Sequence, residues 1–289
     1  MTQSFKKIVI FGVGLIGGSF ALALRRAGVA SEVVGFGRSA ATLEQARQLG
    51  ILDRIGDDVA REVHDADLVL LATPVAQMTD IFARIAPHLG AQTPVTDGGS
   101  TKSDVVAAAR ANLGARIEQF IPAHPIAGAE KSGAAAAQAD LFQGKKVVLT
   151  PLPENSKVAV ARVRNAWEWC GANVSELTAQ QHDEVFAAVS HLPHLLSFAL
   201  VHDLAQRDNR DQLLAFAASG FRDFTRIAAS SPEMWRDICL ANREALMREL
   251  QQYAAELHVL HQALENNDAA KLEEIFSLAR EVRSAWTQQ

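Results

Sequence analysis

The segment that most constrains the fold is GVGLIG (12–17), in which three glycines follow the pattern G-x-G-x-x-G. An apolar run typical of a buried strand, KIVIFG (7–12), precedes it, and a helical pattern follows. In that setting the first glycine permits a tight turn, the second lets the backbone approach a pyrophosphate, and the third lets the helix pack closely on the strand. Unpaired N–H groups at the start of the helix then face the phosphates. The pattern predicts a dinucleotide-binding turn whose cofactor contacts come from Gly12, Gly14, Leu15, Ile16 and Gly17.

Strand and helix patterns alternate through the first half of the chain. The early helical patterns end at Gly28 and Gly50, and further strand-like apolar runs lie at 32–37, 66–74, 93–99 and 145–151. Apolar strands separated by helices are typical of a parallel sheet with helices on both faces. From about residue 180 only helical periodicity remains. We therefore expect an α/β fold, with a Rossmann-type doubly wound parallel sheet in residues 1–175 and an all-helical C-terminal domain in residues 176–289.

One helix of the second domain carries apolar residues at alternating steps of four and three: Leu246, Leu250, Tyr253, Leu257, Leu260 and Leu264. This spacing forms a heptad-like seam along one helix face. Two interpretations stay open, because the seam can pack against a helix of the same chain or against a second subunit. A helical domain attached to a nucleotide-binding domain often supplies a dimer interface, so we expect a homodimer.

Composition argues against several classes of function. The chain has 289 residues, of which 48% are hydrophobic and 21% charged, a balance typical of a globular protein with a sizeable core. The net charge of −5 and the lack of a basic stripe argue against nucleic acid or an anionic membrane as partner. No apolar stretch of about 18 residues and no secretory signal stand out. Cys170 and Cys239 have neither disulfide nor metal spacing, so we expect a cytoplasmic protein and no metal site.

The end of the second predicted strand bears on the choice of dinucleotide. An Asp or Glu there would bind the ribose 2′-OH of NAD, but this chain has Gly37-Arg38-Ser39. Arg38 and Ser39 can bind a 2′-phosphate by charge and hydroxyl contact, which favours NADP. The alternative is that Arg38 stacks near the adenine and NAD is used as well or instead. Ligands of such sheets bind beyond the carboxyl ends of strands, so Thr73 and Pro74 should also line the cofactor cleft.

His124, in AHPIAG (123–128), is the candidate for proton transfer. The proline after it disfavours helix, so His124 should lie in extended or turn geometry facing the cofactor cleft. A dehydrogenase that oxidises an alcohol needs a base for the hydroxyl proton, and histidine suits that role. Ser100, at the neighbouring strand end in DGGSTK (97–102), is placed to hydrogen-bond both the imidazole and a substrate. The alternative is a structural histidine in a loop.

Two segments of the helical half carry polar groups at suggestive spacings. In SHLPH (190–194), His191 and His194 lie three residues apart and share one helix face, while Pro193 should kink the helix. The pair fits either a polar lining of the substrate cleft or ordinary packing, and no third ligand is spaced with it for a metal.

In GFRDFTRIAASSPEMW (220–235), Arg222 and Arg226 lie four apart, and Ser230 with Glu233 resembles a capping box. An arginine at this corner can bind a carboxylate in a bidentate manner, or it pairs with Asp223 on the surface.

These blocks occur in the order seen in a known family. GVGLIGGS, ATPV, DGGSTK, HPIAGAEKSG, SHLPH and GFRDFTRIAASSPEMWRDI resemble the prephenate/arogenate (cyclohexadienyl) dehydrogenases, the TyrA family of tyrosine biosynthesis, over residues 6 to about 250. The resemblance implies oxidative decarboxylation of prephenate to 4-hydroxyphenylpyruvate, or of arogenate to tyrosine, with hydride transfer to NAD(P)⁺. It also implies a helical, dimerising second domain.

The resemblance assigns roles to individual residues. His124 matches the histidine that accepts the 4-hydroxyl proton, and Ser100 matches the serine that orients it. His194 matches a substrate-positioning histidine and Arg226 an arginine that binds a substrate carboxylate. Residues matched to the surroundings of the substrate side chain are Glu130, Trp235, Ala129 and Ser219. Ala129 and Ser219 depart from some members, which have threonine and glycine there, so the choice between prephenate and arogenate stays open.

The sequence leaves three alternative functions to compare. An arogenate-specific dehydrogenase fits the same blocks. A β-hydroxyacid dehydrogenase uses a catalytic lysine on a helix of its second domain, whereas this chain lacks lysine between residues 158 and 270. A non-catalytic dinucleotide-binding protein has no need of His124, Ser100 and Arg226 together.

Overall fold

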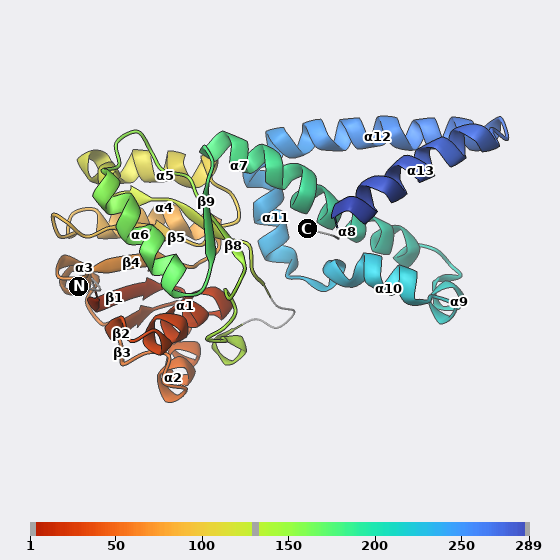
Figure 1. Ribbon diagram of the computed structural model, residues 1–289. Coiled ribbons are helices and arrows are strands. Elements are labelled where there is room, and N and C mark those ends of the chain that lie inside the picture. The colour runs from red at the N-terminus through yellow and green to blue at the C-terminus, as the bar shows by residue number, and fades with distance from the viewer. Residues whose placement is uncertain (1–3, 129–132, 287–289) are drawn as a thin grey trace. The chain divides into compact units, whose positions relative to one another are not determined.

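The computed structural model describes residues 4–128 and 133–286, and it divides the chain into two compact units, residues 1–242 and residues 243–289 (Figure 1). Ala129 and Glu130, which were expected near a substrate side chain, lie outside the described residues. The first unit contains the sheets and the helices up to α11, and the second contains two helices.

A six-stranded sheet, in the order β3-β2-β1-β4-β5-β6, forms the centre of the first unit. Its strands are β1 (Phe5–Phe11), β2 (Ala30–Phe36), β3 (Arg54–Ile55), β4 (Leu68–Leu71), β5 (Val95–Asp97) and β6 (Phe120–Ile121). Every neighbouring pair is parallel. The strand order reverses between β1 and β4, and the carboxyl ends at such a switch point are where open α/β sheets bind ligands. The predicted doubly wound parallel sheet is confirmed.

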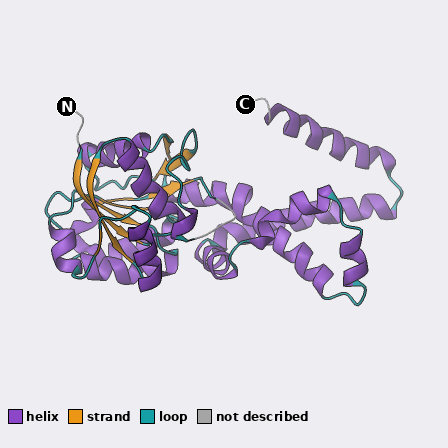
Figure 2. Cartoon of the chain, turned by 90° about the horizontal axis from the view of Figure 1, so that it is seen from below, coloured by secondary structure: helices purple, strands orange, loops and turns teal. Residues whose placement is uncertain are grey.

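Helices cover both faces of this sheet, as Figure 2 shows. Ile8 and Ile10 of β1 pack into one core cluster with side chains of α1 (Leu15–Arg26), α2 (Ala40–Gln48) and α6 (Lys157–Trp169). Val9 and Phe11 alternate with them and join a second cluster with α3 (Val59–His64), α4 (Met78–Ile85) and α5 (Ser103–Leu113). Successive strand residues point to opposite faces, so an unbroken apolar run is what a sheet covered on both sides requires.

A second, three-stranded sheet carries His124. It consists of β7 (Ala123–Pro125), β8 (Lys146–Leu149) and β9 (Asn173–Glu176). β8 pairs antiparallel with β7, where Val148 opposes His124, and parallel with β9. The run at 145–151, expected in the parallel sheet, therefore belongs to another sheet, because apolar character predicts a buried strand without specifying its partner. The extended geometry expected for His124 is confirmed.

Between β9 and residue 242, the regular elements of the described chain are helices, as expected. They form α7 (Ala179–Phe186), a π-helical turn (Ala187–His191), α8 (Leu192–Ala205), α9 (Arg210–Ala215), α10 (Ser219–Thr225) and α11 (Pro232–Ala241). The predicted capping box was wrong by one residue, because the hydroxyl of Ser231, rather than that of Ser230, accepts the N–H of Met234. Pro232 then occupies the first turn, where its missing N–H costs nothing.

One helical run, Ala179–Ala205, is long and apolar enough to cross a membrane by length and composition alone, contrary to the expectation that no such stretch exists. The prediction rested on uninterrupted apolar residues, whereas this run contains histidine and acidic residues among the apolar ones. His182 and Asp183 in its first turns bond to residues of the nucleotide-binding half. The run therefore packs as part of the first unit.

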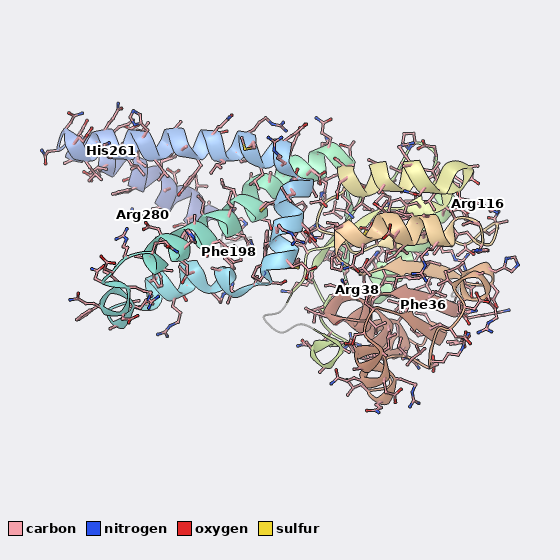
Figure 3. All side chains as sticks on the ribbon, turned by 180° about the vertical axis from the view of Figure 1, so that it is seen from behind. Phe36, Arg38, Arg116, Phe198, His261 and Arg280 are labelled. Carbon is pink, nitrogen blue, oxygen red and sulfur yellow. The ribbon has the colours of Figure 1, made fainter. Side chains whose placement is uncertain are left out.

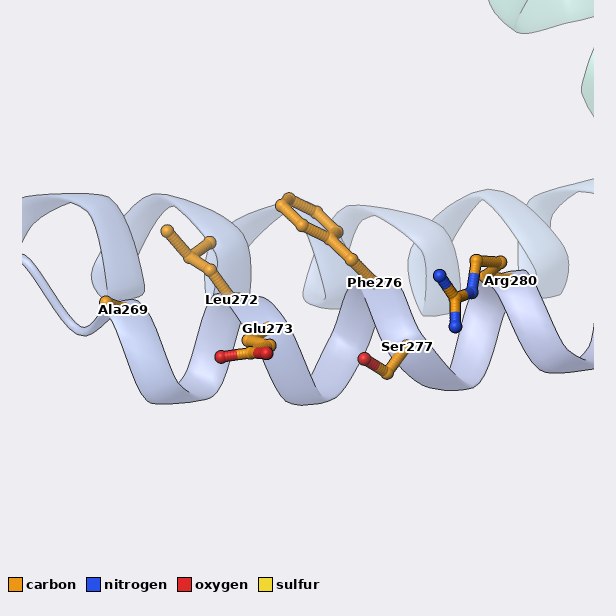
Figure 4. A pocket seen from close by; sticks show the side chains of 6 residues that line it. All are labelled: Ala269, Leu272, Glu273, Phe276, Ser277 and Arg280. Carbon is orange, nitrogen blue, oxygen red and sulfur yellow. The ribbon is translucent and has the colours of Figure 1, made fainter.

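The second unit consists of α12 (Arg243–Glu265) and α13 (Ala269–Trp286). The predicted seam lies on α12, where Leu246 is buried while 48% of Leu257 and 65% of Leu264 is exposed. No described residue of α13 is buried. A shallow hollow on α13 is lined by Ala269, Leu272, Glu273, Phe276, Ser277 and Arg280 (Figure 4). All six belong to one helix, so this is a helix face rather than an enclosed site.

Candidate active site

The glycine turn between β1 and α1 leaves no room for side chains at two positions. Gly12 has a φ of 92°, and a Cβ there would lie 2.5 Å from the carbonyl oxygen of Ala72. A Cβ at Gly17 would lie 2.2 Å from the carbonyl oxygen of Gly12. A Cβ at Gly14 would meet nothing within 4 Å, and α1 starts there without a side-chain cap. The open side of the turn thus presents unpaired N–H groups, which suit a pyrophosphate.

The predicted cofactor and proton-transfer segments meet at Gly98, in the loop after β5. A Cβ on Gly98 would lie 3.1 Å from the side chain of Ile16 and 3.7 Å from that of Pro125. The glycine turn, this loop and the strand of His124 are therefore neighbours. Thr73, after β4, has a buried hydroxyl that bonds to none of the described residues. Its neighbour Pro74 precedes a short 3₁₀ turn at the same sheet edge.

Arg38 is exposed just beyond β2, near Phe36 (Figure 3). Ser39 is the N-cap of α2, and its hydroxyl oxygen accepts the N–H of Thr42 at 3.2 Å. That hydroxyl still has its own proton to donate. A Cβ at Gly37 would come no closer than 3.4 Å to Leu43, so a side chain fits there. Charge and donors at this strand end suit a 2′-phosphate.

His124 lies in a tight aromatic and polar setting. Its ring centroid is 4.9 Å from Phe186 and 5.0 Å from His182, and its Nδ1 lies 2.8 Å from Nε2 of His182. Burial lowers the pKa of His124 well below its ordinary value, and electrostatic interactions with His182, Lys102 and His191 act in the same direction. A lowered pKa keeps the imidazole neutral near pH 7, which is the form that can accept a proton.

The sequence did not single out His182 and Asp183, yet they extend the chain of bonds from His124. Nδ1 of His182 lies 2.8 Å from Oδ1 of Asp183. The same carboxylate accepts the backbone N–H groups of Lys102 and Ser103, each at 2.8 Å. Asp183 therefore caps the N-terminus of α5 from another helix, α7, which fixes His182 relative to the loop after β5.

A buried ion pair holds the strand of His124 in place. Lys102 and Asp97 are fully buried, and the ammonium of Lys102 pairs with the carboxylate of Asp97. The ammonium also donates to the carbonyl of Ala123 at 2.9 Å, and the N–H of Ala123 donates to Asp97 at 2.9 Å. Since Ala123 directly precedes His124, the pair sets where β7 leaves the central sheet. Asp97 and Lys102 are the first and last residues of DGGSTK, and their opposite charges are the sequence signal for this ion pair.

Ser100 is half-buried in the loop after β5. In the described part of the chain, no hydrogen bond joins Ser100 to His124. His191 is buried and contacts the Ser100 backbone. The amide of Asn242 lies 3.0 Å from Nδ1 of His191 and donates to the carbonyl of Asp183 at 2.7 Å. Burial lowers the pKa of His191 to about 4. His191 thus packs as a neutral ring that holds the serine loop.

His194 stacks on Trp235, with ring centroids 3.6 Å apart and planes inclined by 20°. Nδ1 of His194 donates to the carbonyl of Ser190 at 2.8 Å, which leaves Nε2 as an acceptor. Burial and then the nearby charge of Arg226 lower the pKa of His194, with the bond to Ser190 opposing them. The buried indole N–H of Trp235 has no partner among the residues described. A stacked pair beside an arginine can hold a planar, anionic ligand.

Arg226 lies in a 3₁₀ turn (Arg226–Ala229), because α10 ends at Thr225. It therefore does not share a regular helix face with Arg222, as its spacing suggested. Ser219 is the exposed first residue of α10. Charges at both His182 and His194 affect the pKa of His191, so the His124 cluster and the His194 cluster are close enough to interact electrostatically.

Comparison with known protein families shows which family the chain belongs to. Residues 20–176 match the nucleotide-binding domain of prephenate dehydrogenase, and residues 178–278 match the dimerization domain of prephenate dehydrogenase. The chain belongs to the prephenate dehydrogenase family. The fold, the enzyme class and the binding of NAD(P), all expected from the sequence, are confirmed by this membership.

Relatives within the prephenate dehydrogenase family match nearly the whole chain. The cyclohexadienyl dehydrogenase of Zymomonas mobilis is 36% identical over 97% of this chain and 96% of its own length. The prephenate dehydrogenase of Bacillus subtilis is 37% identical over 98% of this chain and 76% of its own.

Two solved structures are similar throughout. Prephenate dehydrogenase from Aquifex aeolicus, in complex with hydroxyphenyl propionate and NAD⁺, has a TM-score of 0.90 and 34% identity over 99% of this chain and all of its own. Synechocystis arogenate dehydrogenase has a TM-score of 0.81 and 30% identity over 97% of this chain and 99% of its own.

Proposed function

We propose that this member of the family catalyses the oxidative decarboxylation of prephenate to 4-hydroxyphenylpyruvate. The observation that carries the proposal is the position of His124. Its strand lies against the loop of Gly98, which also touches Ile16 of the cofactor turn. A neutral imidazole beside a nicotinamide site is what the oxidation of a ring alcohol needs.

The chemistry balances with one base. A nicotinamide cofactor bound at the glycine turn would supply the acceptor for the hydride that leaves the ring carbon bearing the hydroxyl. His124 takes the hydroxyl proton as that carbon becomes a carbonyl. The ring carboxylate then leaves as CO₂, its bonding electrons enter the ring, and the ring becomes aromatic. The phenolate oxygen formed in this way recovers a proton from His124, so the base is restored.

Ser100, on the loop that His191 and Asn242 hold, supplies a hydroxyl toward the reacting oxygen. Arg226 binds a carboxylate of the substrate, and the stack of His194 on Trp235 positions the ring and its side chain. Ser219, like Glu130 in the segment outside the description, belongs to the surroundings of the side chain in this proposal. These roles use a charge-assisted contact for a carboxylate and an aromatic surface for the ring of a dianionic substrate.

For the cofactor, exposed Arg38 and the Ser39 hydroxyl at the end of β2 support a preference for NADP over NAD. Gly12, Gly14, Leu15, Ile16 and Gly17 hold the pyrophosphate in this proposal, and Thr73 and Pro74 line the cleft.

We also propose a homodimer, formed through the helical region, in the cytoplasm. The support is the amount of apolar surface on the second unit: Leu257, Leu264, Phe276, Leu278, Val282 and Trp286 are each about half exposed or more. Exposed apolar patches of this kind mark interaction surfaces. A division between a nucleotide-binding domain at 1–175 and a helical domain at 176–289 fits where the two family matches meet.

The test crosses two substrates with two cofactors. Initial rates of cofactor reduction are measured with prephenate or arogenate, each with NAD or NADP, and the products are identified by mass spectrometry. The proposal expects 4-hydroxyphenylpyruvate from prephenate in amounts equal to the reduced cofactor. Turnover of arogenate alone would make the protein an arogenate-specific dehydrogenase, and no turnover in any combination would contradict an enzymatic role.

A further inference from the structure

Three side chains form a continuous line of hydrogen bonds behind the proposed base. His124 Nδ1 lies 2.8 Å from His182 Nε2, and His182 Nδ1 lies 2.8 Å from Asp183 Oδ1. All three come from packed elements, since β7 carries His124 and α7 carries the other two. The mechanism proposed above uses His124 but gives no role to His182 or Asp183.

Asp183 is an acceptor only. Burial raises the pKa of its carboxyl, but bonds from His182, Ser103 and Lys102 outweigh burial and lower the pKa below its ordinary value. The carboxylate is therefore ionised near pH 7 and has no proton to donate. It follows that the proton on His182 resides on Nδ1, which faces the carboxylate.

The protonation of His182 in turn determines which nitrogen of His124 carries the proton. Burial, more than any charge, lowers the pKa of His182, so its ring is neutral and carries one proton. With Nδ1 protonated, Nε2 of His182 is a lone-pair acceptor, and Nδ1 of His124 must be the donor. The neutral ring of His124 then has its lone pair on Nε2, the nitrogen on the far side from His182.

We propose that His182 and Asp183 are positioning residues that fix the tautomer of His124, so that Nε2 is the nitrogen that accepts the substrate proton. The proposal rests on the function proposed above. The charged and titratable groups that face this line are Asp97 at the end of β5, Lys102 from the loop after β5, and His191 from the turn before α8. When His124 becomes an imidazolium, the bond to His182 and the carboxylate behind it stabilise that cation.

The first experiment reads the tautomer directly. Full-length enzyme labelled with ¹⁵N at histidine, bound to NADP and without substrate, is examined by long-range ¹H–¹⁵N correlation near pH 8, with His124→Asn used to assign the signals. The proposal expects a protonated Nδ1 and an unprotonated Nε2 on His124. A protonated Nε2 would overturn it, whether or not the enzyme turns over prephenate, so this result is independent of the proposed function.

The second experiment removes the acceptor. His182→Phe keeps an aromatic ring against Phe186 but gives His124 no partner. Because a positioned base contributes about 10²–10⁴-fold to the rate, loss of its orientation should lower kcat at least about tenfold. The KM values for substrate and cofactor should stay within about threefold, since neither contact is removed.

Two companion variants separate positioning from packing. His182→Gln offers a carbonyl acceptor and should recover part of the lost kcat, and it should restore the unprotonated Nε2 signal of His124. His202→Phe, at an exposed histidine on α8, is the matched control and should behave as the parent enzyme. An unchanged kcat in His182→Phe would overturn the proposal. If that variant fails to fold, the spectrum of the parent enzyme still decides.

Discussion

The ammonium of Lys102 is fully buried against the carboxylate of Asp97, while the backbone N–H of the same lysine donates to Asp183. One residue thus links the end of β5, the strand of His124 and helix α7. Removing one partner of a buried ion pair leaves an uncompensated charge in the interior, which costs far more than the pair contributes as a whole.

Lys102→Met should therefore lower the free energy of unfolding by about 3–5 kcal/mol. Urea denaturation followed by circular dichroism measures the change. Lys146→Met, at an exposed lysine on β8, serves as the control and should change stability by less than about 0.5 kcal/mol. A loss below about 1 kcal/mol in Lys102→Met would show that the ion pair is not needed to hold this junction.

Cofactor preference should change at the end of β2. Arg38→Ala removes a charge-assisted contact and should raise the Kd for NADP by about 10–100-fold, with little effect on NAD. Gly37→Asp should favour NAD, because a side chain fits there and a carboxylate repels a 2′-phosphate. Fluorescence titration measures both values, and Arg26→Ala, at the far end of α1, is the control. Equal losses for the two cofactors would refute the NADP assignment.

Arg226→Ala should raise the KM for prephenate by about 10–100-fold, because a charge-assisted bond to a carboxylate is lost. Arg226→Lys should recover only part of it, since a lysine cannot make the bidentate contact. Arg222→Ala, one turn earlier, provides the comparison and should leave KM near the parent value. Steady-state kinetics at saturating NADP decide, and equal effects at positions 222 and 226 would remove the special role of Arg226.

The exposed apolar faces of α12 and α13 should hold the subunits together. Phe276→Glu combined with Leu264→Glu places charges on these faces and should halve the mass measured by sedimentation equilibrium. Leu49→Glu changes an equally exposed leucine of the nucleotide-binding half and should leave the mass unaltered. A parent protein that is already monomeric would contradict the dimer.

Some parts of the site were predictable because their chemistry is local. Two features of the glycine turn are local: the φ of 92° at Gly12 favours glycine, and a Cβ at Gly17 would lie 2.2 Å from the carbonyl oxygen of Gly12. The same holds for the extended backbone at His124, which Pro125 imposes. Parallel strands covered on both faces also leave a local signature, namely runs without polar residues.

Other parts depend on partners far apart in the chain. The bonds of His182 to His124 and of Asp183 to Ser103 join residues separated by 58 and 80 positions. Adjacent histidine and aspartate in a helix carry no local sign of such partners. The placement of β8 in the second sheet was not predicted for the same reason, because the residues of a strand do not determine which strand it pairs with. The end of α10 before Arg226 depends on tertiary packing as well.

The pH dependence of activity follows from the environment of His124. The base must be neutral, and burial, followed by nearby positive charges, lowers its pKa. The neutral form therefore persists below the ordinary histidine value of about 6.5, and the acid limb of kcat/KM for the parent enzyme should lie below that pH.

The most direct test of the account is the kcat of His124→Asn with prephenate and NADP, measured beside the Kd for NADP. We expect kcat to fall by about 10²–10⁴-fold while the Kd for NADP stays within about threefold, because the base is lost and the cofactor turn is untouched. His88→Asn, at an exposed histidine after α4, should match the parent enzyme. A parental kcat in His124→Asn would contradict the assignment of His124 as the base and return it to a structural role.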